Sequence, residues 1–407
     1  MVATILLVIE ALIAIGFLFY SLWVLKYALN SKVDEKVNYP DSEPVNIACM
    51  ICARNESMVV GQLVDSLKKQ DYPDANYGIF VVAHNCTDNT AEVAEAAGAE
   101  VFVRNNPEEK KKVNALQYGL DQVREKYGNQ YTHYAVFDAD ALVHKDFLKE
   151  VNKAFGTGVD IVSGFYESKN FAVNTVTKLA STLYYFVMVW QNKPHNASGL
   201  PVNIYGSGYA VKMEYGVNLE EINTQVGDFE FTNRSVLQGA KSAFAPKAKI
   251  YAEMPITLKE ALIQRKRWAI GHAQCSRKYR WKMFKGIKEH GAAARKQLIE
   301  LLHIPLSAAV IIGFIICVIA MIIAGCWNPV GWGLLGLILY LFIFLSILCA
   351  LALKEENRPV LKNLHVVLLM PVWIFLTPWY GFLSLFIRDV EWAETKRTSF
   401  TSIEDIQ

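Results

Sequence analysis

Four long apolar stretches, one at the start of the chain and three near its end, limit the folds that this sequence can adopt. They cover residues 3–25, 306–324, 334–353 and 364–387. A helix that spans a bilayer needs about 20 mostly apolar residues, and each stretch is close to that length. The first has no basic segment before it and no small-residue cleavage site, so it is predicted to be an anchor and not a signal peptide. The sequence therefore predicts a multi-pass integral membrane protein of the cell membrane.

Basic residues predict the orientation in the membrane. Between Lys259 and Lys296 the chain has twelve Lys or Arg residues and two acids. Because positive charge marks the cytoplasmic side, residues 29–300 are predicted to be cytoplasmic and the N-terminus external. Four full spans would place the C-terminus outside, yet the tail contains Lys396 and Arg397. One segment could therefore be re-entrant or a tilted hairpin, and the topology of 364–387 stays open.

The 407 residues leave room for one α/β domain of about 250 residues beside these helices. Apolar runs alternate with helical patterns, which predicts a mostly parallel sheet covered on both faces. The runs lie at 45–52, 78–83, 134–137 and 159–163, and the helical patterns at 58–69, 89–97, 112–126 and 146–154. The predicted units are an anchor (1–28), a cytosolic α/β domain (29–256), amphipathic interface helices (257–303), a transmembrane region (304–390) and a tail (391–407).

One of the predicted strands ends in two acids. Residues 134–140 read Tyr-Ala-Val-Phe-Asp-Ala-Asp, so Asp138 and Asp140 follow an apolar run. Ligands collect at the carboxyl ends of parallel strands, and Mg²⁺ or Mn²⁺ is held by one or two carboxylates together with substrate phosphates. The alternative is that the acids only form a turn.

A second motif follows in the basic region. If residues 264–268 are helical, Gln264, Arg267 and Trp268 lie on one side, where Arg suits phosphate oxygens and indole suits a sugar ring. The alternative is a basic interfacial helix with one Trp anchor. Asp228 opens a helical pattern between the two motifs, and its alternative role is a helix N-cap.

Other segments support less specific predictions. Residues 171–192 predict a long helix, followed by a loop at 192–199 where an acceptor could lie. Gly206-Ser207-Gly208 predicts a turn that allows close approach of a ligand. Cys49 and Cys52 spell C-x-x-C inside an apolar run, but residues three apart on a strand face opposite sides, so they are predicted to be buried hydrophobes in a reducing compartment.

Together these residues resemble the membrane-integrated family 2 glycosyltransferases, which include hyaluronan, chitin, poly-N-acetylglucosamine and cellulose synthases. The resemblance covers most of the chain and implies a GT-A-type fold. It rests on Ala53-Arg54-Asn55-Glu56, Cys86-Thr87-Asp88, Lys112 with Ala115-Leu116, the D-x-D, Asp228, and the Q-x-x-R-W of residues 264–268.

The resemblance also implies roles. Asp228 would be the catalytic base, Asp140 with Asp138 would hold Mg²⁺ or Mn²⁺, and Trp268 with Gln264 would bind the acceptor. The donor would be bound by Arg54, Glu56, His84, Asp88, Lys112, Asp138 and Arg267.

Two positions depart from the family pattern. Ala83 and His84 stand where an acidic pair is usual, and one of those acids normally contacts the nucleotide base. His84 can still form a hydrogen bond, and it predicts a weakly bound uridine donor with pH sensitivity near pH 6–7. Gly227 replaces the acid that usually precedes the base, which leaves Asp228 as the candidate in that motif.

The expected function is inverting transfer of a sugar, from UDP-glucose or UDP-N-acetylglucosamine, to a growing polysaccharide at the lipid bilayer with coupled export. The nearest alternative is a non-processive enzyme with a lipid acceptor. A non-catalytic scaffold and a transporter are further alternatives; intact site residues disfavour the first, and four spans are few for the second. The net charge of +2 gives no reason to expect nucleic acid as a partner.

Overall fold

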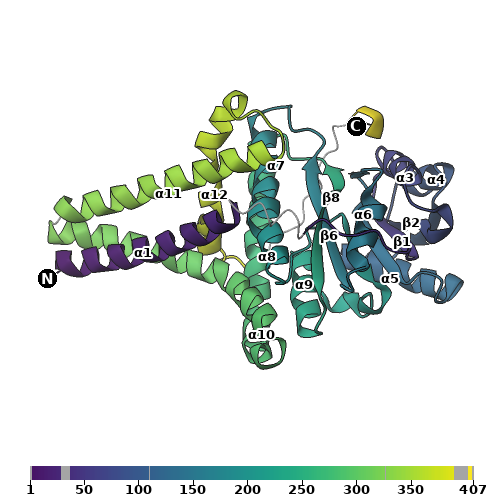
Figure 1. Ribbon diagram of the computed structural model, residues 1–407, viewed down its shortest axis with the longest axis horizontal. Helices are drawn as coiled ribbons and strands as arrows, with labels where there is room; N and C mark the ends of the chain where they lie inside the picture. Colours follow the sequence, from purple (N-terminus) through teal and green to yellow (C-terminus); the bar gives the residue numbers. More distant parts are fainter. Residues whose placement is uncertain (1, 29–36, 110, 326, 389–401, 406–407) are drawn as a thin grey trace.

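A mixed eight-stranded sheet forms the centre of the protein in the computed structural model, which describes residues 2–28, 37–109, 111–325, 327–388 and 402–405 (Figure 1). The strands lie in the order β3-β2-β1-β4-β7-β6-β8-β5. Their bounds are β1 Ile47–Ala53, β2 Tyr77–His84, β3 Glu100–Arg104, β4 His133–Asp138, β5 Leu142–Val143, β6 Ile161–Ser168, β7 Tyr209–Lys212 and β8 Ser242–Ala252.

The four strands β3, β2, β1 and β4 are parallel, as are β6 and β8, whereas β7 runs antiparallel to β4 and β6, and β5 antiparallel to β8. The mostly parallel α/β sheet is thus confirmed, and the four apolar runs became β1, β2, β4 and β6. Strand β8 could not be predicted in the same way, because Pro246 and two lysines interrupt its apolar residues.

Helices cover both faces of this sheet. The helices α3 (Val60–Lys68), α4 (Thr90–Ala96) and α6 (Phe147–Phe155) pack with Cys49 and its alternate neighbours in β1. The helices α5 (Lys112–Tyr127) and α9 (Gly227–Leu237) pack on the other face, with Met50 and Cys52. The two cysteines therefore face opposite sides, as predicted, and burial raises the pKa of both thiols.

The segment after β6 corrects one prediction. The expected long helix is α7 (Thr175–Val187), and it passes through a π-helical turn (Met188–Asn192) into α8 (Lys193–Ala197). The predicted acceptor loop at 192–199 is therefore largely helical. Pro194 follows directly after the π-helical turn, where its missing N–H interrupts the helical hydrogen bonds.

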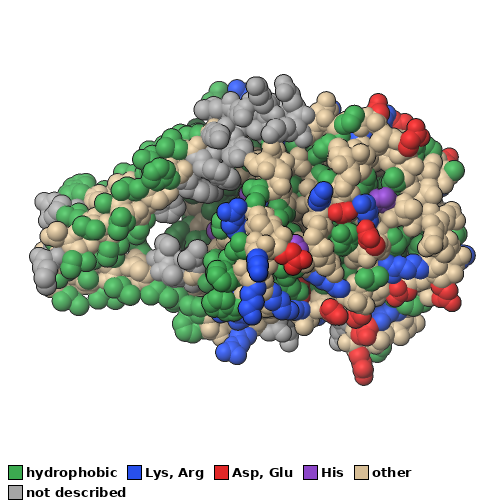
Figure 2. All heavy atoms as spheres, turned by 60° about the horizontal axis from the view of Figure 1, so that its bottom comes forward, with side chains coloured by type: hydrophobic (Ala, Val, Ile, Leu, Met, Phe, Trp, Pro, Cys, Tyr) green, Lys and Arg blue, Asp and Glu red, His purple; other side chains and the backbone are tan. Residues whose placement is uncertain are grey.

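The apolar helices form two different arrangements. Helix α10 (Leu258–Ala324) turns at Gly291, whose φ of 52° interrupts the helix. The end of α10, Ile312–Ala324, lies beside α1 (Val2–Ala28) and α11 (Trp327–Glu355), and this bundle extends away from the sheet (Figure 1). Hydrophobic side chains cover the bundle, and Lys and Arg side chains gather where it meets the rest of the molecule (Figure 2).

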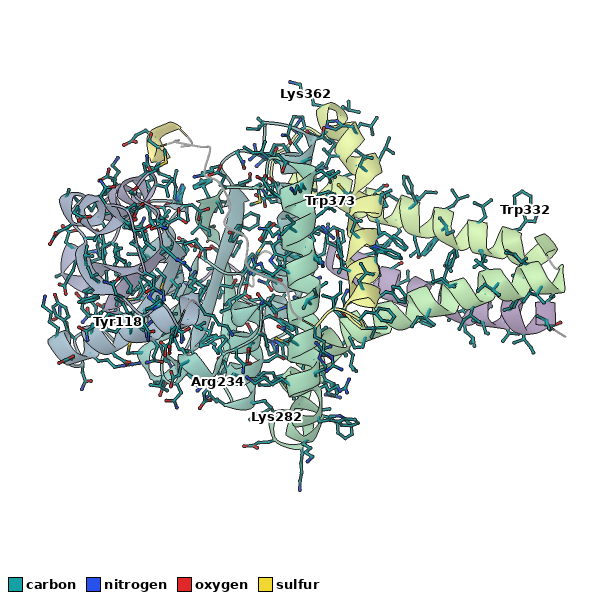
Figure 3. All side chains as sticks on the ribbon, turned by 180° about the vertical axis from the view of Figure 1, so that it is seen from behind. Tyr118, Arg234, Lys282, Trp332, Lys362 and Trp373 are labelled. Atoms are coloured by element: carbon teal, nitrogen blue, oxygen red, sulfur yellow. The ribbon has the colours of Figure 1, made fainter. Side chains whose placement is uncertain are left out.

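Helix α12 (Leu364–Leu383) does not join the bundle. It packs along the first part of α10, across the direction of the bundle (Figure 3). Within the described residues, Val330–Glu355 and Leu361–Leu383 are long and apolar enough to cross a membrane, and Val2–Gly16 and Ile312–Ala324 are shorter apolar helices. Two long apolar helices near the C-terminus are thus part of the fold.

The last described residues return to the sheet. Ile403 is buried against Leu142 of β5 and Tyr251 of β8, and Glu404 forms an ion pair with Lys69. The segment 402–405 therefore lies on the same body as the sheet.

Candidate active site

One glycine joins three of the predicted site residues. Gly206 lies in the turn before β7 with a φ of +60°, which favours glycine. Its N–H donates to Oδ2 of Asp228 at 2.7 Å, and its carbonyl accepts from Nζ of Lys112 at 2.7 Å. Lys112 also pairs with Oδ1 of Asp138 at 2.5 Å. The starts of α5 and α9 and the end of β4 therefore meet at a single turn.

The D-x-D lies at the carboxyl end of β4. The Asp138 N–H donates to Oγ of Ser207 at 2.9 Å, and Asp140 is buried. A Cβ added at Gly206 would lie 3.6 Å from Oδ2 of Asp138, an ordinary van der Waals contact, so the positive φ and not a clash favours glycine here. Within the described residues there is no cluster of three or more His, Cys, Asp or Glu side chains that could hold a metal. Two carboxylates fit a hard cation whose remaining ligands are phosphate and water oxygens.

Charges in this site act on one another. Burial raises the pKa of Asp228 above the ordinary aspartate value, although the N–H groups of Phe229 and Gly206 and the charges of Arg267 and Lys112 oppose the rise. Burial lowers the pKa of Lys112, but the charges of Asp138, Cys52 and Asp228 and the hydrogen bond to Asp138 together outweigh it, so the pKa stands above its ordinary value. Lys112 therefore stays protonated at neutral pH, beside two acids.

The Q-x-x-R-W residues lie on α10 as predicted, but they face different neighbours. Nη1 of Arg267 donates to the carbonyl of Gln225, in the loop before α9, at 3.2 Å. Gln264 and Trp268 line a cleft between α7, α10 and α12. The helix thus presents a cation toward Asp228 and an indole toward α7.

Tyr184 of α7 is a site residue that the sequence did not identify. Its ring meets Trp268 edge-on, with 5.9 Å between centroids. Burial raises its pKa, and the charges of Asp228, Arg267 and both acids of the D-x-D also act on its hydroxyl. It lay within an apolar helical pattern, where tyrosine is commonly a core residue, so no motif distinguished it.

The predicted donor residues after β1 and β2 form a separate cluster. Asp88 accepts from the N–H of Ser57 at 3.2 Å and of Thr90 at 3.1 Å, and the Glu56 N–H donates to Thr90 Oγ1 at 2.9 Å. These bonds tie the loop after β1 to the start of α4. Arg54 has a buried Nε with no partner in the described part of the chain. Donor contacts by Arg54, Glu56 and Asp88 stay predictions.

His84 is buried at the end of β2. Its Nε2–H donates to the carbonyl of Glu109 at 2.6 Å, and its Nδ1 lies 3.5 Å from Nη1 of Arg104. Burial lowers the pKa of the imidazole, and the nearby Arg104 charge adds to this effect. The neutral ring is therefore favoured at neutral pH, and the pH sensitivity predicted near pH 6–7 is now expected at lower pH.

The substitution His84→Asp is expected to tighten UDP binding, because it restores an acid at the position where relatives carry one. Arg104 lies close enough to compensate the new charge. Calorimetry of UDP binding measures the effect, and His84→Asn is the matched uncharged control. Unchanged or weaker binding in His84→Asp would contradict a role of this position in base recognition.

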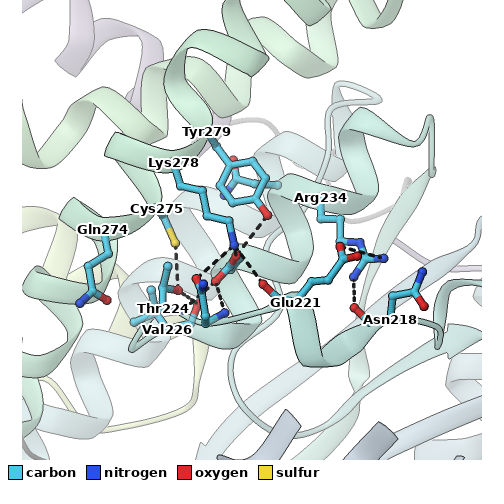
Figure 4. Close-up of polar contacts among 12 residues, drawn as sticks. Asn218, Glu221, Thr224, Val226, Arg234, Gln274, Cys275, Lys278 and Tyr279 are labelled. Carbon is cyan, nitrogen blue, oxygen red and sulfur yellow. Dashed lines mark hydrogen bonds and ion pairs between the residues drawn. The ribbon is translucent and has the colours of Figure 1, made fainter. Parts of the chain in front are cut away.

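A buried network fixes the loop before α9 (Figure 4). Glu230 is fully buried; its Oε1 pairs with Lys278 of α10 at 2.5 Å and accepts from the Tyr279 hydroxyl at 3.1 Å. Its Oε2 accepts the N–H groups of Asn223 and Thr224 at 3.0 and 2.8 Å. Buried charges need such partners, so Glu230 locks the helix of Asp228 to α10.

A mostly parallel α/β sheet, with a D-x-D at the end of a central strand, defines a GT-A-type glycosyltransferase. The sequence profile described as "Glycosyltransferase like family 2" matches residues 44–271, which is 228 of the 407 residues. The chain belongs to this family and is a glycosyltransferase.

Three known proteins illustrate the similarity. The beta-monoglucosyldiacylglycerol synthase of Synechocystis sp. is 31% identical over 116 residues, which are 27% of this chain and 23% of that protein. The match thus spans less than a quarter of the relative. The mannosyltransferase PcManGT from Pyrobaculum calidifontis, in complex with GDP-Man and Mn²⁺, is 16% identical with a TM-score of 0.52, over 93% of this chain and 98% of that one. It shares the fold.

The third is the glucosyl-3-phosphoglycerate synthase from Mycobacterium tuberculosis, in complex with Mn²⁺ and UDP-Glc. It is 20% identical with a TM-score of 0.36, over 55% of this chain and 77% of that one. These neighbours bind a divalent cation together with a nucleotide sugar.

Proposed function

We propose that the protein transfers a sugar from a nucleotide sugar to a lipid acceptor at a membrane surface. The observation that carries this proposal is the cleft beside the site. It runs from Trp268 to Trp373, so its walls belong to α7, α10 and the apolar α12 and not to the sheet. An acceptor in this position approaches from the apolar helices. The relative from Synechocystis, whose name describes a glycolipid synthase, supports the same acceptor class.

In the proposed reaction Asp228 accepts the proton of an acceptor hydroxyl. The hydroxyl oxygen attacks the anomeric carbon opposite the nucleoside diphosphate, so the configuration inverts. Lys112 and Arg267 place positive charge where the leaving diphosphate gains negative charge, and such fixed charges are commonly a large part of catalysis. Asp138 and Asp140 would hold Mg²⁺ or Mn²⁺, which as a Lewis acid stabilises the same diphosphate.

The proposed placement puts three segments in the bilayer: α1, the Ile312–Ala324 end of α10, and α11. Exposed apolar side chains on all three helices, such as Leu12, Ile323 and Ile338, suit lipid. The catalytic domain then lies on the cytoplasmic side, in agreement with the basic residues of α10.

Transfer to lipid and synthesis of an exported polysaccharide predict different products. The test incubates purified full-length protein, in lipid vesicles, with single radiolabelled nucleotide sugars. A lipid acceptor gives label that partitions into organic solvent after one transfer. Label that remains in water-soluble chains of increasing length would support polysaccharide synthesis instead.

Trp268 is expected to hold the acceptor, and Arg267 the donor diphosphate. Trp268→Ala should abolish glycolipid formation and leave slow hydrolysis of the nucleotide sugar, because water needs no aromatic platform. Arg267→Ala should weaken both reactions, since each needs the leaving group stabilised. Released nucleoside diphosphate and labelled lipid are measured in parallel. Equal loss of both activities in the two variants would show that this division of roles is wrong.

A further inference from the structure

Arg265 lies beside the active site, outside the Q, R and W positions of the motif, and is almost fully enclosed. Its side chain lines the cleft between α7, α10 and α12, and 4% of the residue is exposed. Nη2 donates to Oγ1 of Thr377 at 2.7 Å, and the guanidinium carbon lies 5.1 Å from the centre of the Trp373 ring. The side chain is therefore held in place from α12.

Three N–H donors in this cleft have no acceptor among the described residues. They are Nε and Nη1 of Arg265 and Nε1 of Trp373, which is also buried. No carboxylate of the described chain pairs with Arg265. Burial lowers the pKa of the guanidinium to about 10, so it keeps its charge at neutral pH. A buried cation without a counter-ion is costly. The charge of Arg265 needs an anion, and the three unpaired N–H groups need hydrogen-bond acceptors.

We infer that this cleft binds the phosphate group of a membrane lipid. A phosphate supplies negative charge together with several acceptor oxygens, and the forked guanidinium matches that geometry. The interior of the cleft is only about 10 Å³, and the empty space reaches about 200 Å³ when the open mouth is included, so a phosphate enters only when the side chains at the mouth move apart.

The surroundings favour a lipid over free phosphate. The other walls of the cleft are largely apolar and include Ala180, Leu183 and Pro255. Helix α12 also exposes Val372, Phe375 and Trp379, which suit acyl chains next to the site. Figure 3 places Trp373 where α12 meets α10, at the base of the bundle. The phosphate would bind at Arg265, with the acyl chains on the membrane side.

The site adds an anionic lipid to the proposed function, but its test needs no sugar transfer. Full-length protein purified in detergent is mixed with phosphatidylglycerol, with neutral diacylglycerol or with inorganic phosphate, and bound molecules are counted by native mass spectrometry. Wild type should retain phosphatidylglycerol in preference to the other two. Arg265→Ala should bind it about tenfold more weakly, in line with the loss of a charge-assisted pair. Lys259→Ala, an exposed cation on the same helix, is the matched control and should bind as wild type does.

Two milder variants keep the result interpretable if Arg265→Ala does not fold. Trp373→Phe removes one N–H and retains the ring, so binding should weaken by a smaller factor. Arg265→Lys keeps the charge without the fork and should bind between wild type and Arg265→Ala. Equal retention of diacylglycerol and phosphatidylglycerol would overturn the proposal. So would binding of inorganic phosphate as tight as that of the lipid, or unchanged lipid binding in all three variants.

Discussion

Asp228→Asn is expected to reduce sugar transfer by about 10²–10⁴-fold, the usual contribution of a general base, and to leave nucleotide-sugar binding intact. The asparagine retains the shape of the side chain and an oxygen that can accept the Gly206 N–H, which now donates to Asp228 at 2.7 Å. It cannot accept a proton from the acceptor. Transfer rates and calorimetric binding of the nucleotide sugar are measured on the same preparation.

The acid side of the pH–rate profile gives a second test of Asp228. Because burial raises the pKa of this carboxyl, the wild-type rate should fall, as pH decreases, at a pH above that of an ordinary aspartate. Protonation at low pH removes the base, so the residual activity of Asp228→Asn should lack this decline. The exposed Asp121→Asn is the control and should keep the wild-type profile. Rapid transfer by Asp228→Asn would exclude Asp228 as the base.

Asp140→Ala, or removal of divalent cations from the wild type, is expected to abolish most activity. Two carboxylates at the end of β4 are the protein's contribution to the predicted Mg²⁺ or Mn²⁺ site, and the cation stabilises the leaving diphosphate. Steady-state transfer is measured in excess chelator and after stepwise return of each cation. In the wild type, returning the cation should restore the rate.

Chelated wild type and Asp140→Ala should respond differently to added cation. Added Mn²⁺ should rescue chelated wild type fully and Asp140→Ala poorly, because the variant lacks a ligand. Full activity in excess chelator would contradict a metal-dependent mechanism, whatever the behaviour of the variant.

The helices and strands that could be predicted are those whose own sequence pattern indicates the element. The strand that ends at Asp138 has an uninterrupted apolar run, and the periodic patterns of α3 to α6 matched their helices closely. The pairing of β7 between β4 and β6 could not be predicted, because it depends on a long-range contact between short segments. The same holds for α12, which has the composition of a span but packs against α10.

The site residues also differ in whether their own sequence pattern identifies them. Sequence motifs identified Asp138, Asp228 and Lys112 as candidates. Their common contact with Gly206 could not be predicted, because it depends on how distant segments pack. Tyr184 and Arg265 carried no signal of their own. Tyr184 lies in an apolar helix, and Arg265 lies in a basic run. Only the packing of α7, α10 and α12 shows that both residues adjoin the site.

The packing of Ile403 against the sheet limits how many times the chain can cross a membrane after the catalytic domain. A polypeptide that leaves a body through α10 and ends on the same body crosses any intervening bilayer an even number of times. In the proposed placement the Ile312–Ala324 end of α10 and helix α11 make the two crossings, and α12, which packs along the first part of α10, lies at the membrane surface. The proposed placement of α1 adds one crossing before the catalytic domain, so Val2 would lie across the membrane from Ile403.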